Sequence, residues 1–182
     1  AVGSENVFIA TEDKRIADVV HDFDFSSIMT SKDALTGTDR LSEASKQIDA
    51  DIFINVQGDE PLVDPTDIIK IRDAKIKNFD MIVNGFCWVS SDEDPENINI
   101  PKVITNERDE LIYMSRAPLP AFKDEKDAPS NYKKQVCIYA FNANELNSFM
   151  MFGRKSTLEH SEDIEILRFL ELNKKILMVE TK

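Results

Sequence analysis

Two acidic residues follow a short, largely apolar segment in the first half of the chain. Residues 52–56 are rich in β-branched side chains and are followed by Gly58 and Pro61, which is typical of a buried strand and its end. In open α/β sheets, ligands bind just outside the carboxyl ends of such strands, where Asp59 and Glu60 lie. Carboxylates suit Mg²⁺ there, because this cation takes one or two of them and keeps water and phosphate oxygens as its other ligands.

The same two acids also fit a polar turn that has no chemical role. Pro65 is expected to open a helix, and Asp64 directly before it is a typical N-cap. Asp59 and Glu60 would then lie in the loop that leads to this helix. The residues at the end of the strand therefore leave both interpretations open.

A second segment with possible chemistry lies between a short strand, 27–29, and a helix expected over 39–47. Gly37 permits a positive φ, Thr38 is a candidate N-cap, and Arg40 lies in the first turn. Main-chain amides at a helix N-terminus and a nearby guanidinium together form an anion site suited to phosphate. An ordinary capped helix start with a solvated arginine is the alternative.

Both segments occur in an order that the sugar-acid cytidylyltransferases share, and three later motifs continue that order. The chain resembles in particular the 3-deoxy-manno-octulosonate (Kdo) cytidylyltransferases, also called CMP-Kdo synthetases, and the collinear likeness covers essentially the whole chain. The motifs that carry it are Thr36-Gly37-Thr38-Asp39-Arg40-Leu41, Asn55-Val56-Gln57-Gly58-Asp59-Glu60-Pro61, Tyr113-Met114-Ser115-Arg116-Ala117-Pro118, Ile138-Tyr139 and Leu158-Glu159-His160.

The resemblance implies an enzyme that transfers CMP from CTP to the anomeric hydroxyl of a 3-deoxy sugar acid and releases pyrophosphate, with Mg²⁺ as cofactor. Such transfers are catalysed mainly by positioning and charge stabilisation, so no protein nucleophile is needed. It also implies that Asp59 is a metal ligand and catalytic residue, with Arg116 as a second catalytic residue. The implied nucleotide-binding residues are Thr36, Gly37, Thr38 and Arg40, and the implied sugar-binding residues are Gln57, Ser115, Arg116, Gln135, Tyr139, Glu162 and Glu165.

Three of these sugar-binding residues admit other interpretations. Arg116 follows a strand end, where its planar guanidinium suits a substrate carboxylate or a salt bridge at the rim. Gln135 and Tyr139 are four apart on one expected strand and therefore share a face, although Tyr139 could equally be a core aromatic. The family usually carries His where this chain has Gln135, and an amide cannot titrate as an imidazole does. This difference leaves Kdo, its 8-amino analogue and other close relatives open as the sugar.

An acidic group of residues occurs near the start of a helix expected over 160–172. Glu162 and Glu165 are three apart and would share one face of this helix. The resemblance implies that Glu165 reaches a sugar hydroxyl. The alternative is a solvated acidic first turn, which the helix dipole favours.

Strands and helices are expected to alternate along the first half of the chain, which indicates βαβ units. We predict an α/β fold with a Rossmann-like, mostly parallel sheet, helices on both faces and a smaller mixed or antiparallel lobe, of the nucleotide-diphospho-sugar transferase type. Residues 1–89 would bind the nucleotide, and residues 90–182 would bind the sugar and a second copy of the chain. The expected strands are 6–11, 27–29, 52–56, 79–89, 102–105, 111–115, 136–141 and 176–179, and the expected helices are 13–23, 39–47, 65–77, 143–152 and 160–172.

The composition limits the partners. The formal net charge of −12 argues against nucleic acid or an anionic membrane as the main partner. No apolar run approaches the roughly 20 residues of a membrane helix. Cys87 and Cys137 are isolated in apolar segments, so we expect packed, reduced thiols in a cytoplasmic protein. The apolar cluster 149–152 fits either the core or a subunit contact, and the resemblance implies a homodimer.

The family carries a first strand and a basic triphosphate-binding loop ahead of the position where this chain begins, and an Asp-containing turn beyond its end. We therefore expect residues 1–182 to be part of a longer protein. Two other classes stay open. One is a module that binds CTP or a sugar nucleotide without turnover. The other is a glycosyltransferase, but residues 58–61 do not match the Asp-x-Asp motif of that class.

Overall fold

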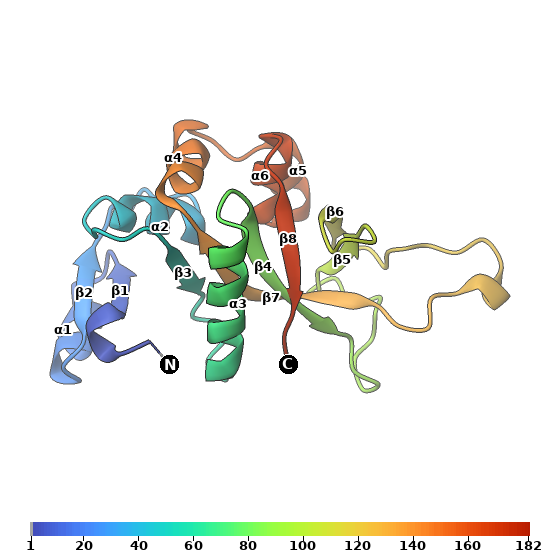
Figure 1. The fold of residues 1–182 in the computed structure, drawn as a ribbon, viewed down its shortest axis with the longest axis horizontal. Coiled ribbons are helices and arrows are strands. Elements are labelled where there is room, and N and C mark those ends of the chain that lie inside the picture. Colours follow the sequence, from blue (N-terminus) through green and yellow to red (C-terminus); the bar gives the residue numbers. More distant parts are fainter. Residues whose placement is uncertain (1) are drawn as a thin grey trace.

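Within residues 2–182, which this computed structural model describes, a six-stranded sheet forms the centre of the molecule and a two-stranded sheet lies beside it (Figure 1). The large sheet has the order β6-β5-β7-β4-β8, and β3 is paired with β7. The strands are β1 Phe8–Thr11, β2 Ser26–Met29, β3 Phe53–Val56, β4 Ile82–Trp88, β5 Lys102–Thr105, β6 Leu111–Ser115, β7 Lys133–Phe141 and β8 Ile176–Glu180. The α-helices are α1 Lys14–Asp22, α2 Gly37–Ser45, α3 Pro65–Lys77, α4 Ala143–Met151, α5 Thr157–Glu162 and α6 Ile166–Glu171.

The α/β class is confirmed, but the central sheet is mixed rather than mostly parallel. Strand β4 is parallel to β8, and β1 is parallel to β2. Strand β7 is antiparallel to β3, β4 and β5, and β5 is antiparallel to β6. Parallel neighbours need a crossover connection, usually a helix, whereas β7 follows a long loop from the β5–β6 pair and enters between β3 and β4 in the opposite direction.

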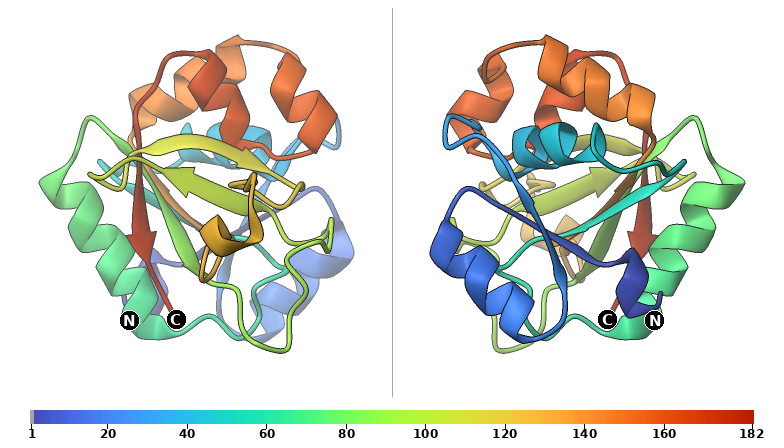
Figure 2. Two further views of the ribbon diagram at one scale, coloured as in Figure 1. Left: turned by 90° about the vertical axis from the view of Figure 1, so that its right-hand side faces the viewer. Right: turned by 90° about the vertical axis from the view of Figure 1, so that its left-hand side faces the viewer.

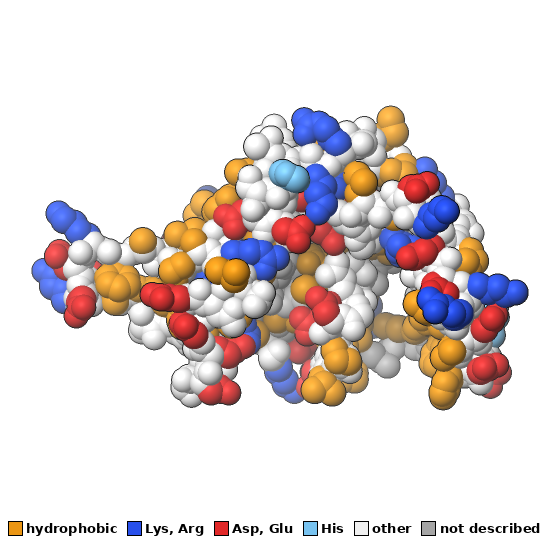
Figure 3. Space-filling view, turned by 180° about the vertical axis from the view of Figure 1, so that it is seen from behind, with side chains coloured by type: hydrophobic (Ala, Val, Ile, Leu, Met, Phe, Trp, Pro, Cys, Tyr) orange, Lys and Arg blue, Asp and Glu red, His pale blue; other side chains and the backbone are white. Residues whose placement is uncertain are grey.

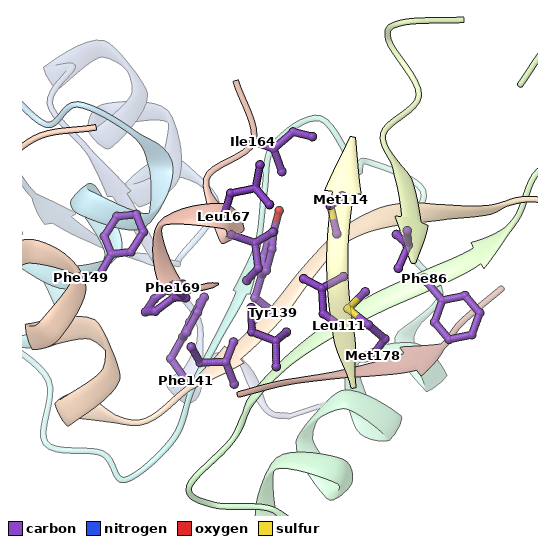
Figure 4. Packing of buried hydrophobic residues seen from close by; sticks show 14 of the residues in the cluster. Phe86, Leu111, Met114, Tyr139, Phe141, Phe149, Ile164, Leu167, Phe169 and Met178 are labelled. Carbon is purple, nitrogen blue, oxygen red and sulfur yellow. The ribbon is translucent and has the colours of Figure 1, made fainter. Parts of the chain in front are cut away.

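Helices cover both faces of the large sheet, as predicted (Figure 2). On one face, Ile71 of α3 packs in a cluster with alternate residues of β4 and β7. On the other face, Phe169 of α6 packs against Phe141 of β7, and Phe149 of α4 packs against Phe169 (Figure 4). Each fully buried side chain of this size contributes roughly 1.5–3 kcal/mol, so these two clusters hold the sheet between its helices.

Strand β7 carries a bulge at its pairing with β4. Asn84 is paired with Tyr139 and the next residue, Gly85, with Val136, so the two residues between them on β7 have no partner on β4. The fully buried Asn84 side chain compensates by donating Nδ2 hydrogen bonds to the carbonyl oxygens of Val136, at 3.0 Å, and Ile138, at 2.9 Å. Bulges of this kind re-aim side chains, and this one lies where β7 passes the end of β3.

Helix α2 begins earlier than its expected start near residue 39. Thr36, not Thr38, is the N-cap, because its Oγ1 accepts a hydrogen bond from the Asp39 main-chain N–H at 3.2 Å. The same hydroxyl donates to the Asp39 carboxylate at 2.8 Å. Helix α3 follows the prediction, with Asp64 as its N-cap and Pro65 in the first turn.

The prediction of a single helix over 160–172 is wrong, because two short helices, α5 and α6, occupy most of that stretch. Helix α5 ends at Glu162, and Asp163 takes a left-handed conformation with φ of 52° before α6 begins. At this break the side chain of Ile164 is buried in the core cluster, and its packing there favours the break over a further turn of helix. Glu162 and Glu165 therefore do not share a helix face.

A long loop, residues 116–132, connects β6 to β7 and extends from the body of the molecule (Figures 1 and 2). Its regular structure is one short 3-10 turn, Glu125–Asp127. Figure 3 shows acidic, basic and hydrophobic side chains along this extension. Within the described part of the chain, no helix combines the length and apolar character needed to cross a bilayer.

Candidate active site

The turn that follows β3 is held against the bulge of β7. The main-chain N–H of Gln57 donates to the carbonyl oxygen of Cys137 at 3.2 Å. The carboxylate of Glu60 accepts a hydrogen bond from the N–H of Cys137 at 3.1 Å. One residue of the bulge thus binds both ends of the turn, and Asp59 lies between them, exposed at the tip of the strand.

Glu165 joins this turn to the start of α2. Its carboxylate accepts hydrogen bonds from the main-chain N–H groups of Gly37, at 3.1 Å, and Thr38, at 2.8 Å. The side-chain amide of Gln57 also lies 3.4 Å from it. A Cβ atom at Gly37 would lie 2.9 Å from the Gln57 amide nitrogen, so a side chain here would displace the end of the Gln57 side chain. The helix N-terminus does bind an anion, but that anion is the protein's own carboxylate.

Arg40 lies apart from those amides. Its guanidinium donates to Thr30 Oγ1 at 2.6 Å and forms an ion pair with Glu12 at 2.5 Å. It therefore ties α2 to the segments that follow β1 and β2. In this geometry the guanidinium and the amides have different partners, and the phosphate site expected from Arg40 and the α2 amides stays a prediction.

The carboxylate of Glu162 accepts three hydrogen bonds from residues at the end of β6. It accepts them from Ser115 Oγ at 2.7 Å, from Tyr113 OH at 3.2 Å and from the main-chain N–H of Arg116 at 2.9 Å. Burial acts to raise the pKa of this carboxyl, but these hydrogen bonds outweigh it and hold the pKa below its ordinary value. Glu162 is thus an ionised carboxylate that fixes the end of β6.

The Arg116 guanidinium binds main-chain carbonyl groups. It donates to the carbonyl oxygens of Glu162 at 2.5 Å, Asp163 at 3.0 Å and Ile98 at 2.9 Å. A cation at the carboxyl end of a helix is favourable, so Arg116 stabilises the end of α5. The salt bridge considered from the sequence is not found among residues 2–182. The contact with a substrate carboxylate stays a prediction.

Gln135 and Tyr139 lie on the same face of β7, as predicted. The Gln135 Nε2 donates to the Tyr139 hydroxyl at 3.0 Å and to Asn84 Oδ1 at 3.1 Å. The Tyr139 side chain lies in the core cluster, where it stacks on Phe141 with ring centroids 5.9 Å apart (Figure 4). Its ring is therefore a core aromatic, as the alternative interpretation held, while its hydroxyl supports Gln135.

Burial shapes the ionisation of the neighbouring groups. Desolvation, with the nearby Asp59 carboxylate, raises the pKa of the Cys137 thiol to about 12. Desolvation also raises the pKa of the Tyr139 phenol well above its ordinary value. Both groups are neutral at physiological pH, so neither serves as a nucleophile or base there.

An ion cluster that was not predicted from the sequence lies beneath α2. Arg168, which is fully buried, donates to the Glu159 carboxylate at 2.6 and 2.7 Å and to the Asp39 carboxylate at 2.8 and 3.1 Å. Its guanidinium also lies over the Phe149 ring, 3.6 Å from the centroid. The available signal was a single arginine within the otherwise apolar run 166–170. This cluster locks α2 to α5 and α6 and so positions both Glu165 and the amides that it binds.

A divalent cation would have one free carboxylate at this site. Among the described residues, Asp59 has no hydrogen bond or ion pair, and no group of three or more His, Cys, Asp or Glu side chains is close enough to enclose a metal ion. Glu60 already accepts the Cys137 N–H. This donor set fits Mg²⁺, which is commonly held by one or two carboxylates together with substrate phosphates.

The fold and these motifs agree with comparisons to known proteins. A sequence model described as cytidylyltransferase matches residues 2–176. The chain is 38% identical over 184 residues to a 3-deoxy-manno-octulosonate cytidylyltransferase of Trichlorobacter lovleyi, covering 96% of this chain and 73% of that protein. It is 37% identical over 184 residues to an 8-amino-3,8-dideoxy-manno-octulosonate cytidylyltransferase of Shewanella oneidensis, covering 97% of this chain and 73% of that protein.

Solved structures show the same relationship. The structure of a CMP:2-keto-3-deoxy-manno-octonic acid synthetase complexed with CTP superposes with a TM-score of 0.87 and 32% identity, covering 96% of this chain and 71% of that one. A glucose-1-phosphate thymidylyltransferase of Bacillus anthracis, at 13% identity and a TM-score of 0.61, shares the fold. The fold and these similarities define a nucleotidyltransferase. This chain belongs to the cytidylyltransferase family.

Proposed function

We propose that this chain belongs to an enzyme that transfers CMP from CTP to the anomeric hydroxyl of 3-deoxy-manno-octulosonate or a close analogue, for lipopolysaccharide synthesis. One observation carries the proposal: three segments converge at the carboxyl end of β3. They are the turn after β3, the start of α2 and the α5–α6 break, and Glu165 in that break is hydrogen-bonded to the other two. The similarity to a CTP-bound synthetase over 96% of the chain supports it.

The start of α2 is proposed to hold the cytidine part of the nucleotide. The amides of Gly37 and Thr38 already bind Glu165, so a phosphate group cannot use them in this conformation. Thr36 directly precedes these amides, and its hydroxyl is hydrogen-bonded to Asp39. Arg40 fixes this loop through Thr30, so its proposed role in nucleotide binding is to support the loop.

Asp59 is proposed as the metal ligand. It lies exposed at the tip of β3, and the turn that carries it is fixed at both ends by Cys137. Mg²⁺ bound there would neutralise phosphate charge and favour ionisation of the attacking hydroxyl. The protein itself contributes a fixed carboxylate at the carboxyl end of the strand and needs no nucleophile of its own.

The sugar is proposed to lie between the turn after β3 and the end of β6. Gln57, Gln135 and Glu165 would face it from one side, and Ser115, Arg116 and Glu162 from the other. Tyr139 would act behind Gln135, because its ring is only 4% exposed. Arg116 would retain its carbonyl contacts and contribute positive charge toward the sugar carboxylate.

The assignment of nucleotide binding and sugar binding to two parts of the chain is also a proposal. Residues 1–89 would bind the nucleotide, and residues 90–182 would bind the sugar and form the contact of a homodimer. Strand β4, at the boundary, pairs with both β7 and β8, so one sheet connects the two parts. We propose a cytoplasmic location, where CTP is available.

The test is pyrophosphate release by the full-length protein. We expect release that requires CTP, a divalent cation and the sugar acid together. A second candidate, binding without turnover, is favoured by the carboxylate of Glu165 on the α2 amides. CTP binding measured by calorimetry, with no pyrophosphate released from either sugar, would establish this second function and contradict the first.

A further inference from the structure

The amide orientation of Asn84 is determined by the bulge in β7. Its Nδ2 lies 3.0 and 2.9 Å from two main-chain carbonyl oxygens, those of Val136 and Ile138. A carbonyl oxygen can only accept, so the nitrogen of this amide must face β7. The Asn84 Oδ1 then remains as the acceptor for the Gln135 side chain on the same strand, whose Nε2 lies 3.1 Å from it. Asn84 is fully buried.

The orientation of the Asn84 amide determines the orientation of the Gln135 amide. Since Asn84 presents an acceptor, the nitrogen of the Gln135 amide turns toward it and also donates to the Tyr139 hydroxyl at 3.0 Å. Both hydrogens of Nε2 are then used. Within residues 2–182, no group donates a hydrogen bond to Gln135 Oε1. The partly exposed Gln135 side chain therefore has a single free polar atom, and that atom is an acceptor.

We propose that Asn84 is a positioning residue for substrate selection, which holds the Gln135 amide so that only its carbonyl oxygen faces the sugar. The proposal rests on the proposed function. A substrate group at this position must donate a hydrogen bond. An ammonium group donates only, and its hydrogen bond to a neutral carbonyl is charge-assisted. The geometry thus favours an amino sugar acid over its hydroxyl counterpart.

The charges nearby favour a cationic group as well. Asp59 and Glu165 act on the Tyr139 phenol behind Gln135, and Glu60 and Asp59 act on the adjoining Cys137 thiol. None of these three carboxylates has a Lys, Arg or His partner among the ion pairs of the described residues. With Mg²⁺ on Asp59, the negative charges of Glu60 and Glu165 would still act near Cys137 and Tyr139 and attract an amino group.

The test compares the full-length parent protein with Asn84→Ser and Asn84→Ala. The quantity measured is kcat/KM for 8-amino-3,8-dideoxy-manno-octulosonate divided by kcat/KM for 3-deoxy-manno-octulosonate, from pyrophosphate release. We expect this ratio to fall about tenfold in both variants, the size expected when a hydrogen bond to a charged group is misplaced. Thr181→Val is the matched control, because it removes a buried hydrogen bond to Phe86 of the same strand without touching Gln135. The control should keep the parent ratio.

A second measurement does not depend on turnover. The side-chain amide protons of Gln135, assigned by NMR with a Gln135→Met variant, should exchange slowly in the parent and in Thr181→Val, and at least tenfold faster in Asn84→Ser. An unchanged sugar ratio in folded Asn84 variants overturns the proposal. If the parent uses neither sugar, the proposed function fails, and the exchange data still decide whether Asn84 holds Gln135. Rapid exchange in the parent overturns the positioning role even if the Asn84 variants do not fold.

Discussion

Glu165 and Thr38 lie 127 residues apart in the chain, yet the carboxylate of the first accepts a 2.8 Å hydrogen bond from the main-chain N–H of the second. Gly37 donates to the same carboxylate. The two first-turn N–H groups of α2 therefore find their acceptor at the N-cap residue of α6, and the positive end of the α2 dipole faces a negative charge. This contact brings the proposed nucleotide and sugar regions together.

Replacing Glu165 should measure that contact. Glu165→Ala leaves two N–H groups at the helix start without an acceptor, and we expect unfolding free energy to fall by about 1–3 kcal/mol in urea titrations. Glu165→Gln keeps one acceptor oxygen and should lose less. Glu125→Gln, on the exposed 3-10 turn of the long loop, serves as the charge control. Equal stability of Glu165→Ala and the parent would contradict the interpretation.

Removal of the Asp59 charge should abolish turnover and leave the fold intact. Asp59→Asn keeps the shape of the side chain but weakens the one free carboxylate at the tip of β3, where the phosphates need a metal. We expect pyrophosphate release by the full-length variant to fall at least ~100-fold at saturating Mg²⁺, with an unchanged melting temperature. Near-normal Mg²⁺-dependent release would rule out Asp59 as a metal ligand.

We expect the loop before α2 to select cytosine over the other nucleotide bases. A ligand that binds only the folded state raises its melting temperature by mass action. At equal concentrations we expect CTP to raise the melting temperature of the full-length protein more than ATP, GTP or UTP. Four equal shifts would indicate a generic phosphate site and contradict selection of cytosine.

Gln135→His should shift sugar preference toward 3-deoxy-manno-octulosonate. An imidazole can be protonated and would then repel an ammonium group, whereas the carbonyl oxygen of Gln135 accepts from it. The expected change in relative catalytic efficiency corresponds to about 1–2 kcal/mol. Competition between the two sugars in one reaction measures it directly. An unchanged preference would show that Gln135 does not select the sugar.

Glu162 should contribute stability that depends on pH. The folded-state pKa of this carboxyl lies below its ordinary value of 4.5, so the ionised form stabilises the fold above that pH. The contribution is lost as the pH falls through the folded-state pKa. Glu162→Gln should therefore be less stable than the parent at neutral pH, and the difference should shrink as the pH falls through the folded-state pKa. Urea titrations at several pH values check this, and a constant difference would contradict it.

Local patterns were sufficient for most elements. The β-branched run before Gly58 and the cap at Asp64 are short-range signals, and β3 and α3 lie close to their predicted bounds. The motifs around Thr36 and Asp59 also placed the family correctly, since their order along the chain is a property of the sequence alone. These features depend on neighbours in sequence, which is why they could be recognised without a structure.

Contacts between distant segments could be decided only by the tertiary structure. The direction of β7 depends on the path of a long loop, and the break at Asp163 depends on burial of Ile164 in a core that other elements build. The carboxylate of Glu165 could have met solvent, a sugar or a helix start, and only the docking of α6 beside α2 selects the last. Polar groups buried by such packing take whichever partners the fold brings within hydrogen-bond distance, and no short-range pattern encodes those partners.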